Sequence, residues 1–126
     1  MSHPALCRSL VLILLLAACA TSRVPATGFA EPQVIEREIK RYYERHASEE
    51  NQSCLTPYID GLTRVTLVDE QPDRLVLDAR YLYRDRFKDD RNNGIGAECT
   101  GYAERQFTLA KTDAGLQVVA MGESRR

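Results

Sequence analysis

The hydrophobic positions of this chain change their period along the sequence, and each period predicts a different element. From residue 32 to about residue 50, apolar side chains recur every three to four positions, which is the spacing of one helical stripe. The stripe consists of Val34, Ile35, Ile39, Tyr42, Tyr43, His46 and Ala47. Most other positions are charged, so the pattern predicts an amphipathic helix that begins at Pro32 and packs on another element.

Beyond this helix the period becomes two, which is typical of half-buried strands. The predicted strands cover residues 62–69, 74–84, 97–111 and 116–121, and turn-forming residues lie at 70–73 and 112–115. Short links between consecutive strands favour an antiparallel meander. We therefore predict an α+β fold, in which one N-terminal amphipathic helix packs on a four-stranded antiparallel meander sheet.

Alternating large and small residues also predict how the two long strands pair. Tyr81 is expected opposite Ala103, and Tyr83 opposite Gly101, because a large side chain then faces a small one. The other pairs of this register are Leu75 with Leu109, Leu77 with Phe107, Arg80 with Glu104 and Leu82 with Tyr102. The face of Tyr81 and Phe107 is expected to receive the helix.

The first 18 residues have the features of an export signal. Arg8 is the one charged side chain among them, and residues 10–18 form an uninterrupted apolar run. The run is about half as long as the roughly 20 residues that a transmembrane helix needs. We therefore expect a signal peptide over residues 1–18.

The end of this run, Leu16-Ala17-Ala18-Cys19, resembles the lipobox of bacterial lipoproteins. The resemblance implies that Cys19 receives a diacylglyceryl group, that cleavage precedes it, and that its new amino group is acylated, for example with palmitate. The implied partners are the lipoprotein processing and sorting machinery and a membrane. In a host with two membranes, Ala20 implies the periplasm-facing inner leaflet of the outer membrane. The alternative is an ordinary secretory signal.

The remaining boundaries follow from composition. Residues 19–30 are mostly small and turn-forming, so they predict a lipidated cysteine with a flexible tether, and Phe29 is a candidate docking contact. Residues 31–122 are assigned to the α+β domain, and residues 123–126 to a disordered tail.

Composition excludes several functions. The 17 basic and 18 acidic side chains leave no excess positive charge for nucleic acid. His46 is the one histidine outside the signal peptide, and no nucleophile elbow is present, so we expect no enzyme, metal or cofactor.

The loop at 85–96 resembles a calcium loop, but Arg91 and Thr100 stand where ligands are required. We expect a solvated contact loop there.

Cys54 and Cys99 are the thiols that remain if Cys19 is lipidated and Cys7 leaves with the signal peptide. Exported proteins meet an oxidising compartment, so we predict a disulfide between Cys54 and Cys99. It would connect the segment after the helix to the sheet. A pair of reactive thiols is the alternative, although the Cys-x-x-Cys spacing is absent.

Arg105 is predicted to face the helix, between Ala103 and Phe107, where an unpaired charge is unstable. Either a β-bulge near Glu104 turns it outward, or a helix carboxylate such as Glu38 or Glu44 pairs with it. The alternative is a cleft in which Arg105 and nearby tyrosines receive a small anionic ligand. The candidate tyrosines are Tyr42, Tyr43, Tyr81 and Tyr83.

A helix followed by about four antiparallel strands resembles the cystatin-like and nuclear-transport-factor-2-like families of small α+β domains. In the larger family further helices form the wall of a pocket, and this chain is too short for a full set. We therefore expect a lipid-anchored, non-catalytic envelope protein whose exposed sheet face and 85–96 loop contact a protein partner. The alternative function is a small-ligand-binding domain with its cleft around Arg105.

Overall fold

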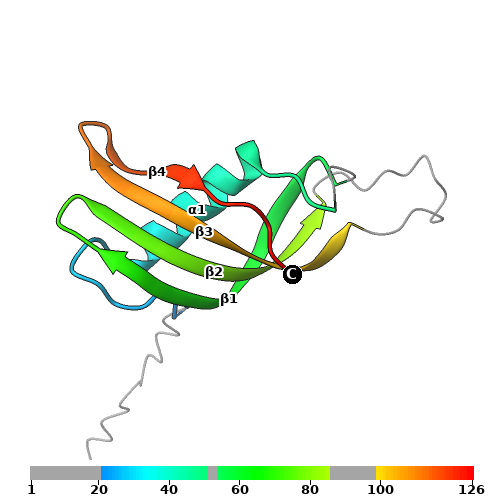
Figure 1. The fold of residues 1–126 in the computed structure, drawn as a ribbon, viewed down its shortest axis with the longest axis horizontal. Helices are drawn as coiled ribbons and strands as arrows, with labels where there is room; N and C mark the ends of the chain where they lie inside the picture. The colour runs from blue at the N-terminus through cyan, green and yellow to red at the C-terminus, as the bar shows by residue number, and fades with distance from the viewer. Residues whose placement is uncertain (1–20, 51–53, 86–98) are drawn as a thin grey trace, which may run out of the picture.

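The computed structural model describes residues 21–50, 54–85 and 99–126. Helix α1 (Pro32–His46) precedes four strands, which are β1 (Pro57–Glu70), β2 (Arg74–Asp85), β3 (Thr100–Thr112) and β4 (Gly115–Met121) (Figure 1). The strands form one antiparallel sheet in the order β1-β2-β3-β4. The predicted α+β arrangement of one helix and a four-stranded antiparallel sheet is confirmed.

Helix α1 begins at the predicted residue but ends earlier than predicted. The backbone becomes extended at Ala47, whose N–H still donates to the carbonyl of Tyr43 at 2.9 Å. The predicted end near residue 50 is wrong because Glu49 pairs with Cys54 in an antiparallel bridge, which takes up their backbone groups. Ile35, Ile39 and Tyr43 are the fully buried residues of α1.

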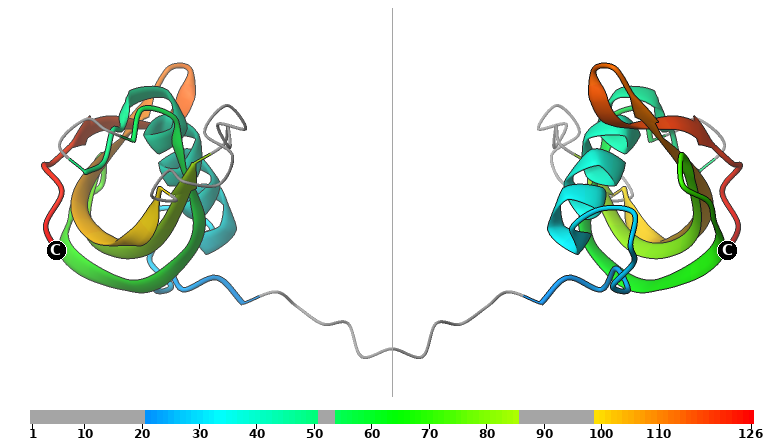
Figure 2. Two further views of the ribbon diagram at one scale, coloured as in Figure 1. Left: turned by 90° about the vertical axis from the view of Figure 1, so that its right-hand side faces the viewer. Right: turned by 90° about the vertical axis from the view of Figure 1, so that its left-hand side faces the viewer.

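The sheet curves around α1, so the helix lies on its concave side (Figure 2). The backbone of α1 comes closest to the edge strands β1 and β4. Pairing between β1 and β2 is interrupted by three register shifts, the first between Ile59 and Gly61. Such bulges increase the bend and twist of a strand. They also break the period of two at the start of β1. The predicted start at Leu62 is therefore wrong by five residues, because the strand begins at Pro57.

The predicted register between β2 and β3 is confirmed. Tyr81 lies opposite Ala103, Tyr83 opposite Gly101, and the other predicted pairs are also present. The inward side chains of these strands form the core under α1, and the large ones that are fully buried include Tyr81, Phe107, Leu75, Leu77 and Leu109.

The segment before α1 packs on the domain. Val24 and Phe29 are 4% and 5% exposed and belong to the core, as expected for Phe29. Gly28 N–H donates to Glu70 Oε1 at 3.0 Å, and Lys111 Nζ lies 4.6 Å from the centre of the Phe29 ring. The prediction of a flexible tether over 19–30 is therefore wrong for residues 22–30, because these two apolar side chains are buried against the sheet.

The C-terminal segment continues along β3. Gly122 N–H donates to Gln106 O at 2.8 Å, and Glu104 and Arg125 exchange backbone hydrogen bonds of 2.8 and 2.9 Å. The tail predicted at 123–126 is therefore wrong, because this backbone is paired through Arg125. Gly122 and Arg125 are three residues apart, whereas their partners Gln106 and Glu104 are two apart, which is the geometry of a bulge. The domain extends well beyond the predicted 31–122.

The pairing of Tyr83 with Gly101 gives a direct test of this packing. A methyl group on Gly101 would lie 2.7 Å from the Tyr83 hydroxyl oxygen and 3.0 Å from Cζ. Since Tyr83 is buried, we expect Gly101→Ala to lower the free energy of unfolding by about 1–3 kcal/mol. Urea unfolding measures the change. Gly61→Ala is the control, because no atom lies within 4 Å of its added methyl group, and equal effects of the two variants would contradict this packing.

Candidate functional site

A buried polar cluster lies at the C-terminal end of α1, on the concave side of the sheet. Its cation is Arg105 of β3, which is 8% exposed. Arg105 Nε donates to the Tyr81 hydroxyl at 2.9 Å, Nη1 donates to the Gly122 carbonyl at 2.9 Å, and Nη2 donates to the Ser48 carbonyl at 2.8 Å. The guanidinium thus joins β3 to the segments that follow α1 and β4.

The anion of the cluster is Glu49, whose side chain is 1% exposed. Its Oε1 lies 3.3 Å from Arg105 Nη2 and accepts hydrogen bonds from Tyr43 at 2.9 Å and Tyr81 at 2.7 Å. Its Oε2 accepts a hydrogen bond from Ser124 Oγ at 2.8 Å. Both charges are therefore compensated inside the protein, as buried ions require.

The predicted partners of Arg105 are wrong. Glu38 pairs with Arg37 and Arg41 along α1, and the partner of Arg105 is Glu49. The early end of the helix explains the difference, because the chain then turns back beneath it. The predicted outward bulge near Glu104 is also wrong, since β2 and β3 pair without a register shift.

The electrostatics of the cluster keep its tyrosines protonated. Burial raises the pKa of Tyr43 far above its usual range, and Tyr81 and Glu49 raise it further. Burial also raises the pKa of Tyr81, as does its hydrogen bond to Glu49, against an opposing effect of Arg105. Burial lowers the pKa of Arg105, but Tyr81 and Glu49 outweigh it and leave that pKa raised. The cluster therefore holds fixed donors and a fixed cation near neutral pH.

The candidate ligand residues divide into two groups. Arg105 and Tyr81 belong to the cluster, whereas Tyr83 donates separately to Glu50 Oε1 at 3.1 Å, and burial together with this bond raises its pKa. Tyr42 stacks on His46, with ring centres 4.0 Å apart. In the cluster a protein carboxylate, Glu49, occupies the place where an anionic ligand was expected. Arg105 is thus paired with a protein carboxylate, as one of the sequence-based alternatives expected, but the carboxylate is Glu49 and not a residue of the helix.

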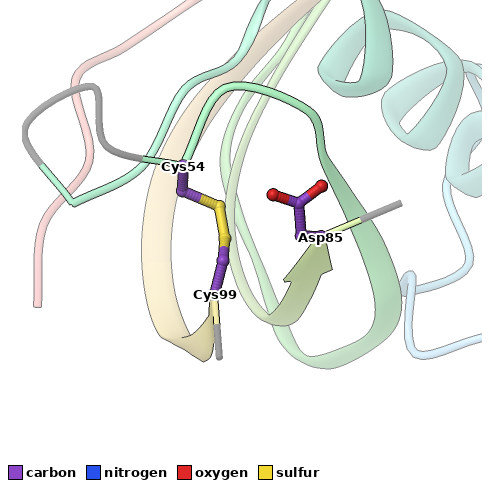
Figure 3. A group of neighbouring side chains, drawn as sticks. All are labelled: Cys54, Asp85 and Cys99. Atoms are coloured by element: carbon purple, nitrogen blue, oxygen red, sulfur yellow. A yellow bond between two sulfur atoms is a disulfide. The ribbon is translucent and has the colours of Figure 1, made fainter. Parts of the chain in front are cut away.

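The predicted disulfide between Cys54 and Cys99 is present, with 5.8 Å between the Cα atoms (Figure 3). It fixes the segment after α1 to the residue before β3, next to the end of β2. Asp85 lies next to it: its N–H donates to the Cys99 carbonyl at 2.9 Å, and its carboxylate accepts a hydrogen bond from Thr56. Possible metal-ligand atoms of Cys54, Asp85 and Cys99 lie within 4.8 Å of one another. In the disulfide form, however, neither sulfur is a thiolate ligand.

The outer face of the sheet carries a charged group that sequence reasoning did not assemble. Arg64, Arg80, Glu104 and Arg125 lie in one row across it, and Tyr102 beside them is 54% exposed. The pairing of Arg80 with Glu104 was predicted. Arg64 and Arg125 were missed, because the shifted register of β1 and the pairing of the C-terminal segment leave no local signal. A groove of about 560 Å³ runs along the exposed side of α1.

Three further predictions concern residues outside the described part of the chain. These are the signal peptide over residues 1–18, the lipidation of Cys19 and the contact role of residues 86–96. His46 is described, and it is exposed with its Nδ1 2.9 Å from the Tyr42 carbonyl. No helix among the described residues is long and apolar enough to cross a bilayer. Comparisons with family models, curated proteins and solved structures found no match to this chain.

Loss of the buried cation should destabilise the fold. Arg105→Leu leaves the Glu49 carboxylate buried without its cation, so we expect the free energy of unfolding to fall by about 3–5 kcal/mol. Arg64→Leu breaks an exposed ion pair with Glu104, and we expect a loss below about 1 kcal/mol. Urea unfolding of both variants measures the difference. Equal losses would show that the buried pair has no special role.

Loss of the disulfide should also destabilise the domain. The cystine closes a loop between residues 45 positions apart, so the Cys54→Ser/Cys99→Ser double variant should lose about 4 kcal/mol on the chain-entropy model. Denaturant unfolding measures this, with the reduced wild-type chain as a second reference. Thiol titration of the unreduced, denatured protein should find neither cysteine free, and two free thiols at these positions would contradict the assignment.

Proposed function

We propose that this chain is a lipid-anchored, non-catalytic protein of the bacterial cell envelope. In this proposal Cys19 carries the lipid after removal of residues 1–18, and the folded domain binds a protein partner through the outer face of its sheet. In a two-membrane host the anchor lies in the inner leaflet of the outer membrane, facing the periplasm.

The lipobox sequence and the disulfide support export and anchoring. Leu16-Ala17-Ala18-Cys19 supplies the modification signal, and a disulfide persists in oxidising compartments. Two or more acyl chains give stable membrane attachment, whereas a single chain gives marginal binding. In this proposal the apolar side of α1 serves to pack the helix on the sheet and does not bind the membrane.

The packed segment before α1 supports a particular orientation. Ser22 Oγ donates a hydrogen bond to Glu36 Oε2 at 2.5 Å. Burial acts to raise the pKa of Glu36, but this hydrogen bond and the ion pair with Lys40 outweigh it and leave that pKa lowered. Ser22 is three residues after Cys19, so an extended chain between them spans at most about 11 Å. A lipid on Cys19 would therefore hold the domain against the membrane with the start of α1 nearby.

The observation that carries the proposed binding role is the contrast between the two faces of the sheet. The concave face is covered by α1, and its buried charges pair with each other. The outer face exposes Tyr102 among arginines, and aromatic and arginine side chains are enriched at protein interfaces.

Photo-crosslinking in a bacterial host tests the proposal. A photoreactive residue at Tyr102 or Thr66 probes the outer face, and one at Gln33 probes the exposed side of α1 as a control. We expect both outer positions, and not Gln33, to capture the same protein. Cys19→Ser should release the chain from the membrane fraction and abolish that product. A product from Gln33 alone would contradict the binding face, and an unmodified mass for the membrane-extracted chain would contradict the anchor.

A further inference from the structure

A row of charged residues crosses the outer face of the sheet from β1 to the C-terminal segment. Arg64 pairs with Arg80, Arg80 with Glu104, and Glu104 with Arg125. Together with Tyr102 and Arg126, these four residues line a groove of about 260 Å³, which we call the arginine groove. The fold thus brings arginines of β1, β2 and the C-terminal segment to one small surface.

The carboxylates of this surface balance only part of its positive charge. Glu104 is shared, since its Oε2 lies 2.9 Å from Arg64 Nη2 and its Oε1 lies 3.3 Å from Arg125 Nη2. Asp78 lies 3.2 Å from Arg125. Within the residues that the structure describes, neither Arg80 nor Arg126 forms an ion pair with a carboxylate. Like charges opposite each other on a sheet repel, so an added anion would relieve the contact between Arg64 and Arg80.

The groove also has an exposed aromatic wall. The guanidinium carbon of Arg80 lies 5.8 Å from the centre of the Tyr102 ring, which holds the charge over the ring. The planar fork of an arginine donates two parallel hydrogen bonds to a carboxylate. A carboxylate on an aliphatic stem would meet the cation with its oxygens and Tyr102 with its methylene groups.

We propose that the arginine groove binds an acidic segment of the partner protein, with a glutamate or aspartate carboxylate at Arg80. This inference rests on the proposed function and names the chemistry of the partner. Charge complementarity supports it, because the surplus of the groove is positive. The groove is also small, which suits one or two side chains at a time.

The position of the groove favours a protein over lipid phosphates. The C-terminus, where Arg125 and Arg126 line the groove, lies on the opposite side of the domain from the described N-terminal end at residue 21 (Figure 2). A lipid on Cys19 would bring residue 21 to the membrane. The groove would then point away from the bilayer and toward other proteins.

Binding of a fluorescein-labelled hexaglutamate peptide to the full chain, followed by fluorescence anisotropy, tests the proposal. The assay is run at physiological salt, where charges more than about 8 Å apart are largely screened, so that it reports close contacts. We expect saturable binding that Arg80→Gln weakens by about tenfold, the loss of one charge-assisted hydrogen-bonded contact. Arg37→Gln removes the same charge from the exposed side of α1 and should leave the affinity unchanged.

Several outcomes would overturn the inference. These are no binding of hexaglutamate, equal weakening by both variants, or binding confined to inorganic phosphate or to phosphatidylglycerol vesicles. Urea midpoints confirm that Arg80→Gln and Arg37→Gln are folded. Crosslinking from Thr66, which is exposed on the outer face but does not line the groove, judges the proposed function independently: a captured partner without hexaglutamate binding would remove the acidic-segment inference alone. Hexaglutamate binding without a captured partner would instead remove the proposed function.

Discussion

The buried pair of Arg105 and Glu49 constrains most of this fold. Neither charge is stable in the interior without the other, and the pair also needs hydrogen bonds to its remaining atoms. Ser48 and Tyr43 supply these from α1 and its end, Tyr81 supplies one from β2, and Gly122 and Ser124 supply others from the C-terminal segment. One ion pair therefore determines where the helix stops and where the chain runs after β4. The disulfide of Cys54 holds the same connection a few residues later.

The features that sequence predicted are those set by neighbouring positions. The register of β2 and β3 follows from matching Tyr83 to Gly101 and Tyr81 to Ala103, because size complementarity acts between adjacent strands. The inward parity of Arg105 follows from the same alternation. The cystine followed from counting the thiols that remain if the expected export signal and lipidation account for Cys7 and Cys19.

The features that sequence missed depend on segments meeting in three dimensions. Glu49 becomes the partner of Arg105 only because α1 ends at His46, and no local pattern indicates that end. Val24 and Phe29 are single apolar residues among small ones, so they have no period, yet both enter the core. The charged row on the outer face requires the bulges of β1 and the pairing of Arg125 with Glu104, and both depend on tertiary structure.

The paired C-terminal segment determines where a reporter group can be attached. Ser124 donates a hydrogen bond to a buried carboxylate, and Arg125 pairs with β3. A fusion at this end would therefore disturb these contacts and cover part of the outer face of the sheet. A fusion at the opposite end would interfere with any processing before Cys19. The hairpin between β3 and β4 is better suited, because Asp113 and Ala114 are exposed and Thr112 closes the turn with its own hydroxyl. An epitope or dye inserted there would leave both ends of the protein in their native state.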